Sequence, residues 1–313
     1  MMFAFVFPGQ GSQSVGMFAD YAAHPIVRAT IDEASDALGQ DLWTLVEEGP
    51  AEALNQTVNT QPVMLAAGVA VWRAWLAAGG ARPALVAGHS LGEYTALVAA
   101  GALTFRDALP LVRFRAQAMQ EAVPAGVGAM AAILGLDDAG VAAACAEGAQ
   151  GQMVEPVNYN APNQVVIAGH REAVERAVTA AKARGAKRAV LLPVSAPFHS
   201  SLLKPAAARL AARLAEVPVA APLLPVLHNV DVRERPAPED IRAALAQQAA
   251  SPVRWVETVQ ALAARGVTHV VECGPGKVLA GLTKRIVPDL ASIALTDSAA
   301  IDATLAELGV AAR

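Results

Sequence analysis

The chain has 313 residues, of which 54% are hydrophobic and 17% charged, and its formal net charge is −4. These values predict a globular protein with a sizeable core, and they argue against a disordered chain or a nucleic-acid-binding protein. The two cysteines form no CxxC pair and the six histidines form no HxxxH or HExxH pattern, so we expect no metal site.

The apolar segments are too short to cross a membrane. The longest run, residues 63–72, ends at Arg73. The N-terminus has no basic segment, and its apolar run ends at Pro8-Gly9, so no secretory signal is expected. We therefore expect a cytoplasmic protein with reduced thiols and no membrane contact.

Residues 3–7 predict a buried strand, because all of them are apolar or aromatic. The strand runs into Pro8-Gly9-Gln10-Gly11-Ser12-Gln13, and α/β folds present backbone groups to ligands at such glycine-rich turns. A phosphate loop is the alternative, but GxGxxG and a following Lys-Ser or Lys-Thr are absent. Helices are expected over residues 17–38 and 60–78, the second ending before Gly79-Gly80.

Residues 84–94 contain Gly-His-Ser-Leu-Gly between a short apolar strand and a helix predicted over 91–100. This is the strand–turn–helix context in which Gly-x-Ser-x-Gly holds a nucleophilic serine. Gly88 and Gly92 remove side chains that would clash in the strained turn, and the turn lifts the Ser90 hydroxyl clear of the sheet. The N–H of Leu91 is then a natural donor to an oxyanion. The alternative is an ordinary turn with a small serine.

The next helix is expected over residues 104–123, with Pro110 in its first turns or at a kink. Arg113 and Arg115 lie partly outside the apolar stripe of this helix, so one of them can project into a cleft.

From Gly126 onward the pattern changes to βαββαβ, the ferredoxin-like unit. Strands are predicted over 129–136, 153–158, 164–168 and 187–192, and helices over 137–147 and 172–184. We predict an inserted small domain over residues 126–193. Residues 1–125 and 194–313 would form the large catalytic domain.

After residue 193 the chain returns to alternating helices and strands. Helices are expected over 202–215, in two further stretches and from Ile301, and strands over 268–272 and 293–295. Residues 222–227 lead into His228-Asn229-Val230-Asp231. Together with the N-terminal part this alternation predicts an α/β domain of the α/β-hydrolase type, with a mostly parallel sheet and helices on both faces.

An activated serine needs a base within hydrogen-bond reach. His89 is adjacent in sequence, but neighbouring residues at a turn point in different directions. His199, in a loop at the domain boundary, and His228, after residues 222–227, both remain candidates from the residues alone. Asn158 and Asn160 either line the cleft or cap a turn.

Five motifs carry a family resemblance, and they occur in this order: Pro8-Gly9-Gln10-Gly11-Ser12-Gln13, Gly88-His89-Ser90-Leu91-Gly92-Glu93-Tyr94, Gln120-Glu121-Ala122-Val123-Pro124, Pro197-Phe198-His199 and Glu272-Cys273-Gly274-Pro275-Gly276. With these motifs the chain resembles the malonyl-CoA:acyl carrier protein transacylases of bacterial type II fatty-acid synthesis over essentially its full length. Polyketide-synthase acyltransferases share most of the motifs.

The resemblance implies a role for each matching residue. Ser90 would be the nucleophile, His199 its base, and the N–H groups of Gln10 and Leu91 the oxyanion hole. Arg115 would bind the malonate carboxylate. The resemblance further implies that the main-chain carbonyl of Gln248 orients His199 and that Phe198 limits the acyl group to malonyl.

The implied reaction is ping-pong transfer. Malonyl-CoA acylates Ser90, and the phosphopantetheine thiol of acyl carrier protein then takes the malonyl group. No cofactor is expected, since transfer from thioester to ester to thioester is near thermoneutral, and we expect a monomer. The alternatives are a polyketide or malonate-decarboxylase acyltransferase, a serine esterase or thioesterase, and an inactive carrier-protein-binding module.

Overall fold

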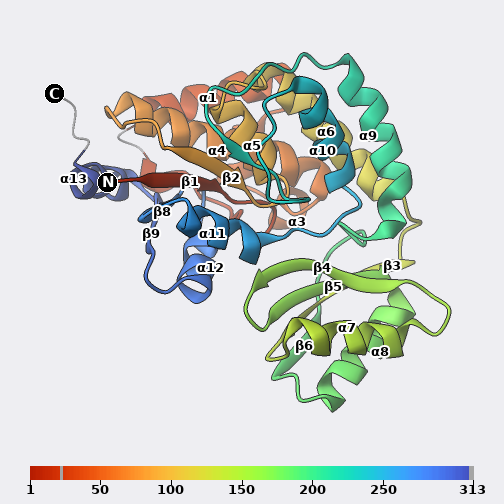
Figure 1. The fold of residues 1–313 in the computed structure, drawn as a ribbon. Coiled ribbons are helices and arrows are strands. Elements are labelled where there is room, and N and C mark those ends of the chain that lie inside the picture. Colours follow the sequence, from red (N-terminus) through yellow and green to blue (C-terminus); the bar gives the residue numbers. More distant parts are fainter. Residues whose placement is uncertain (22–23, 310–313) are drawn as a thin grey trace.

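Two sheets organise the computed structural model, which describes residues 1–21 and 24–309 (Figure 1). The larger sheet is parallel throughout, in the order β7-β2-β1-β8-β9, and the smaller is antiparallel, in the order β4-β5-β3-β6. The strands of the larger sheet are β1 (Phe3–Phe7), β2 (Leu85–Gly88), β7 (Val226–Leu227), β8 (His269–Glu272) and β9 (Ala291–Ala294). Those of the smaller sheet are β3 (Gly128–Leu134), β4 (Val154–Ala161), β5 (Gln164–His170) and β6 (Arg188–Leu191).

Helices cover both faces of the parallel sheet, as the alternation of elements predicts. Before the small sheet the chain forms α1 (Pro25–Leu38), α2 (Leu42–Glu47), α3 (Ala51–Leu54), α4 (Thr57–Ala77), α5 (Gly92–Ala99) and α6 (Phe105–Glu121). After it come α9 (Lys204–Glu216), α10 (Pro238–Gln248), α11 (Trp255–Ala264), α12 (Val278–Ile286) and α13 (Ser298–Leu308). In Figure 1, α4, α5 and α6 lie above the sheet, and α11 and α12 lie below it.

Strand β1 shows why the sheet is covered on both sides. Successive side chains of a strand point to opposite faces. Phe3, Phe5 and Phe7 belong to the hydrophobic cluster of the α4 and α6 side, whereas Ala4 and Val6 belong to the cluster of α11 and α12. The aromatic side chains fill the thicker layer, where Phe5 packs edge-on against Trp72 and Trp75.

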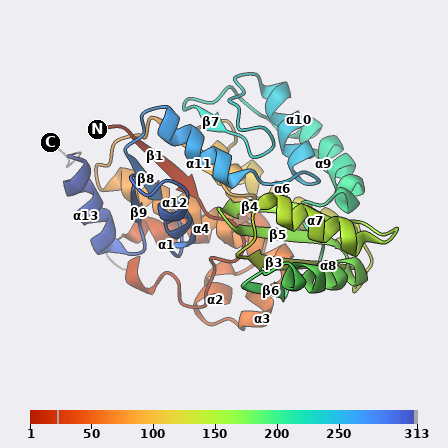
Figure 2. The same ribbon diagram turned by 60° about the horizontal axis from the view of Figure 1, so that its bottom comes forward.

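The small sheet has the ferredoxin-like strand order, which confirms the predicted fold class. Helices α7 (Asp138–Ala149) and α8 (Arg171–Ala183) cover one face of it. Strand β5 alternates in the same way as β1: Val165 and Ile167 pack under α7 and α8, and Val166 and Ala168 join the large core. Figure 2 shows this second face turned toward the rest of the molecule. The small sheet therefore forms one wall of the space beyond the carboxyl ends of β1 and β2.

Strand β4 is also tied to the large core by main-chain hydrogen bonds. Val253 donates its N–H to Val157 O at 2.8 Å and accepts from Tyr159 N at 3.0 Å. This bridge lies just after α10 and joins the edge of the small sheet to the segment that precedes α11. It restrains the small sheet at a further place, besides its two chain connections.

The helices before β2 differ from the prediction in two places. The expected helix over 17–38 is a short 3₁₀ turn, Ala19–Tyr21, followed by α1, which has Pro25 in its first turn; residues 22–23 lie outside the described part. Helices α2 and α3 were not predicted, because six and four residues are too few for a helical period to show. Among the described residues, no helix is both long and apolar enough to span a bilayer.

Candidate active site

The turn that carries Ser90, the predicted nucleophile, spans residues 89–91 between β2 and α5 and is called the nucleophile turn below. Ser90 has φ +51°, in the left-handed region that is strained for a residue with a side chain. A Cβ at Gly88 would lie 1.9 Å from the carbonyl carbon of Gly92, and a Cβ at Gly92 would lie 2.0 Å from Phe7 O. Only glycine fits these two positions, so the motif spacing follows from the close approach of strand and helix.

Two hydrogen bonds of Asn229 hold this strained turn. Its Oδ1 accepts from Ser90 N at 2.7 Å, and its Nδ2 donates to Gly88 O at 2.6 Å. Sequence reasoning missed Asn229. The only signal was its place in the polar stretch His228-Asn229-Val230-Asp231, and such stretches are common.

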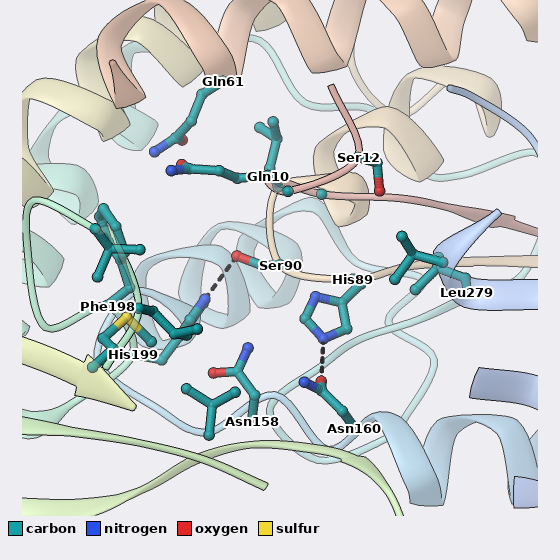
Figure 3. Close-up of a pocket in the computed structure, with 18 of the residues that line it drawn as sticks. Gln10, Ser12, Gln61, His89, Ser90, Asn158, Asn160, Phe198, His199 and Leu279 are labelled. Atoms are coloured by element: carbon teal, nitrogen blue, oxygen red, sulfur yellow. Dashed lines mark hydrogen bonds between the residues drawn. The ribbon is translucent and has the colours of Figure 1, made fainter. Parts of the chain in front are cut away.

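Ser90 and His199 lie together although they are far apart in the chain. Ser90 Oγ is 2.7 Å from His199 Nε2 (Figure 3). The other ring nitrogen, Nδ1, is 2.9 Å from the main-chain oxygen of Gln248. A carbonyl oxygen can only accept, so Nδ1 carries the proton and Nε2 is free to accept from the serine hydroxyl.

His199 is buried, and burial together with the nearby Arg115 cation lowers its pKa to about 3. The imidazole is therefore neutral around pH 7 and can take a proton. The alternative base, His228, is fully buried and lies 2.7 Å from Glu93 Oε1 through its Nδ1. The geometry thus favours His199 over His228 as the partner of Ser90.

Arg115 projects from α6 into the same space, and only 2% of it is exposed. Its Nη2 lies 3.2 Å from Ser90 Oγ and donates to Gln248 Oε1 at 2.9 Å, and its Nη1 donates to Gln61 Oε1 at 2.7 Å. These partners are neutral, and no carboxylate of the described residues pairs with Arg115. The guanidinium is therefore available to an anionic group of a ligand. Arg113 instead bonds to Leu38 O and Gln40.

A cavity of about 250 Å³ opens above Ser90 between the large core and the small sheet. Gln10 and Leu91 line it on the side of the parallel sheet, and Gln10 Oε1 accepts from Thr57 Oγ1 at 3.0 Å. Apolar side chains line much of the remainder: Met119, Met130, Val166, Leu192, Val194, Phe198, Leu279 and Leu282. One end of the cavity is thus cationic and the rest largely apolar, which fits a small acid carried on a longer, less polar arm.

Asn160 also lines this cavity, and its Oδ1 lies 2.8 Å from His89 Nε2 (Figure 3). His89 is half-buried, and its ring packs edge-on against Trp255. His89 therefore faces away from Ser90 and links the nucleophile turn to β4. Among the residues that the structure describes, no cluster of His, Cys, Asp or Glu could hold a metal ion.

Known proteins share both the sequence and the fold of this chain. Residues 4–299 match the acyl transferase domain family. A malonyl CoA-acyl carrier protein transacylase of Salmonella typhimurium is 59% identical, over 97% of this chain and 99% of its own. The crystal structure of an acyl-carrier-protein S-malonyltransferase from Burkholderia pseudomallei superposes with a TM-score of 0.96 at 64% identity, covering 98% of this chain and all of that one (100%).

A second solved structure is a malonyl-transacylase, PlMCAT, in complex with AntF, a type II polyketide-synthase acyl carrier protein. It is 55% identical to this chain, with a TM-score of 0.97, and covers 98% of this chain and 100% of that one.

Proposed function

The chain belongs to the acyl transferase family, and we propose that it moves a malonyl group from malonyl-CoA to the phosphopantetheine thiol of an acyl carrier protein, supplying extender units for fatty-acid biosynthesis. The observation that carries this proposal is the buried Arg115, whose Nη2 lies 3.2 Å from Ser90 Oγ. A cation held so close to a nucleophile selects an acyl group with a second, free carboxylate.

The first half-reaction makes an ester on Ser90. Ser90 Oγ attacks the thioester carbonyl carbon while His199 Nε2 takes the hydroxyl proton. The N–H groups of Gln10 and Leu91 stabilise the oxyanion of the tetrahedral intermediate. The C–S bond then breaks, and His199 returns its proton to the departing CoA thiolate. The main-chain oxygen of Gln248, 2.9 Å from Nδ1, keeps the ring in the tautomer that this step needs.

The second half-reaction runs the same steps in reverse with a different thiol. His199 takes the proton of the phosphopantetheine thiol, and the sulfur attacks the ester carbonyl. The C–O bond to Ser90 breaks, and His199 protonates the serine oxygen. One thioester is exchanged for another, so the proposed reaction needs neither a cofactor nor an energy source.

Two further residues shape the substrate site in this proposal. Phe198 precedes the base and lines the cavity, where its ring limits the room beside the acyl group. Asn160 lines the cavity from β4 and contacts the bound substrate. We propose that residues 126–193 form a small domain that closes this cleft, that residues 1–125 and 194–313 form the large one, and that the protein acts as a cytoplasmic monomer.

The family also includes enzymes of polyketide synthesis, and the PlMCAT–AntF complex pairs a close relative with such a carrier protein. The carrier that this chain serves is therefore identified by comparing malonyl transfer to a fatty-acid carrier protein with transfer to a polyketide-synthase carrier protein. A serine esterase, in contrast, would have no use for the buried Arg115.

Steady-state kinetics with malonyl-CoA and holo-acyl carrier protein test the proposal. We expect malonyl-carrier protein as the product, and double-reciprocal lines that stay parallel as the carrier concentration changes, because CoA leaves before the carrier reacts. Release of CoA with free malonate and an unmodified carrier would instead indicate a hydrolase.

A further inference from the structure

Glu93 is a buried carboxylate for which the transfer steps above have no role. It lies in the first turn of α5, three residues after Ser90, and is 0% exposed. Burying a charged group is costly unless hydrogen bonds compensate it, so the partners of such a residue indicate its role.

Three N–H donors converge on its two carboxylate oxygens. His228 Nδ1 donates to Oε1 at 2.7 Å. Asn229 N and Gln248 Nε2 each donate to Oε2 at 2.9 Å. Glu93 therefore connects three segments that are distant in sequence: the nucleophile turn, the loop after β7 and the end of α10.

Two of these partners contact groups that the reaction uses. Gln248 accepts from Arg115 Nη2 through its side-chain oxygen at 2.9 Å, and its main-chain oxygen lies 2.9 Å from His199 Nδ1. Its Nε2 also donates to Ser90 O at 3.0 Å. Asn229, the second partner, binds the main chain on both sides of the turn.

The amide of Gln248 can present its oxygen to Arg115 only if its NH₂ group points the other way. Glu93 Oε2 and Ser90 O both accept from the NH₂ group on that other side. An amide turned by 180° would direct its NH₂ group at the guanidinium, donor against donor. Glu93 is the charged one of these two acceptors, so it contributes the stronger hydrogen bond that keeps the amide oxygen facing Arg115.

We propose that Glu93, held by His228, is a positioning residue that fixes the Gln248 amide and through it the guanidinium of Arg115, and so sets the preference for malonyl over acetyl groups. This inference rests on the proposed function. Charge supports it as well: burial lowers the pKa of Arg115, and the negative charge of Glu93 opposes that effect. Arg115 thus keeps its charge without a carboxylate in direct contact that would compete with the substrate.

The test compares kcat/KM for loading Ser90 from malonyl-CoA and from acetyl-CoA, read by intact mass. Glu93→Met keeps the length of the side chain but removes both acceptors. We expect the malonyl-to-acetyl ratio of kcat/KM to fall about tenfold. This is the effect of losing one charge-assisted hydrogen bond, the one from Gln248 Nε2 to Glu93. Glu93→Gln should keep the ratio within about threefold, since its single oxygen can still face Gln248 while its NH₂ group faces His228 Nδ1 in the other tautomer.

Glu272→Met is the matched control. Glu272 is also 0% exposed, but it accepts from Ala280 N at the start of α12 and has no contact with Gln248. A substitution that only destabilises the fold lowers the fraction of active protein. This lowers both kcat/KM values by the same factor and leaves their ratio unchanged. The control should therefore lower stability and leave the ratio unchanged.

If Glu93→Met does not fold, Glu93→Asp decides the question. It keeps the charge, but its carboxylate is one methylene too short to reach Gln248, so the ratio should again fall several-fold. A malonyl-to-acetyl ratio that stays within twofold of wild type in the folded variant, E93M or E93D, would overturn the inference. A wild-type protein that loads no malonyl group would overturn the proposed function instead.

Discussion

Arg115 and His199 owe their properties to burial beside each other. The guanidinium lowers the pKa of the imidazole, and both are held by the same residue, Gln248. At the scale of single residues, the site therefore combines a neutral base with a cation that can receive the substrate's free carboxylate.

Arg115→Ala should separate recognition of the acyl group from the chemistry. We expect kcat/KM for malonyl-CoA to fall by about a hundredfold, because a buried charge-assisted pair contributes about 3 kcal/mol, and loading from acetyl-CoA to fall much less. Loading rates followed by intact mass give both numbers. Arg113→Ala, on the same helix, should change neither, because its side chain bonds to Leu38 O and Gln40 outside the cavity. Equal losses for the two substrates in R115A would contradict this role.

The lowered pKa of His199 predicts an unusual pH profile. The neutral ring is the base, and a pKa near 3 keeps it neutral throughout the range from pH 7.5 to 5.5. The single-turnover rate constant for acylation should therefore stay nearly constant over that range. A base with the ordinary histidine pKa of about 6.5 would lose about tenfold of its rate there. A fall of that size, measured by quenched-flow mixing, would count against His199 being buried and neutral.

At the scale of elements, the strand–turn–helix of β2 and α5 is fixed by steric contact. Gly88→Ala would place a Cβ 1.9 Å from rigid backbone at Gly92, so we expect a loss of about 3 kcal/mol in the free energy of unfolding. Denaturant melts measure it. Gly281→Ala is the control: this exposed glycine within α12 has nothing within 4 Å of its added Cβ, so alanine should stabilise the protein by about 0.5–1 kcal/mol. Equal stabilities for the two variants would contradict the steric account.

Most elements could be predicted because their patterns are local. The apolar run of β1 and the helical period of α6 each show within a short stretch of sequence. The same holds for each strand and helix of the small sheet, and their order then gives βαββαβ. The six-residue α2 and the four-residue α3 do not, since helices so short are stabilised by packing rather than by their own pattern.

The site divides in the same way. Gly-His-Ser-Leu-Gly indicates the nucleophile because its physics is local. The position of Arg115 depends on how α6 packs against the rest of the chain, and from the sequence its role came only from the family resemblance. Glu93 was quoted within a motif without a role, because a buried carboxylate is recognised by its partners, and those lie 135 and 155 residues away in the chain.

At the scale of the whole molecule, the small sheet forms one wall of the cavity beside Ser90. A serine ester survives only if water is kept from it, and the restraint of β4 by Val253 helps to hold this wall in place. The ferredoxin-like unit is therefore part of the site as well as an insertion in the chain.

Val253→Pro tests this restraint, because it removes the N–H that donates to Val157 O at 2.8 Å. We expect the malonyl ester, formed in the absence of carrier protein, to hydrolyse several-fold faster, as read from the decay of the adduct mass. Val253→Ala loses packing but keeps both main-chain hydrogen bonds, so its ester should last as long as that of wild type. An unchanged lifetime in V253P would show that the bridge does not exclude water.

The central claim is that the malonyl group is carried on Ser90, and intact mass after brief mixing with malonyl-CoA tests it most directly. We predict one malonyl adduct on the wild-type protein, none on Ser90→Ala, and loss of the adduct when holo-acyl carrier protein is added. An adduct on both proteins, or CoA release with no adduct on either, would contradict the claim.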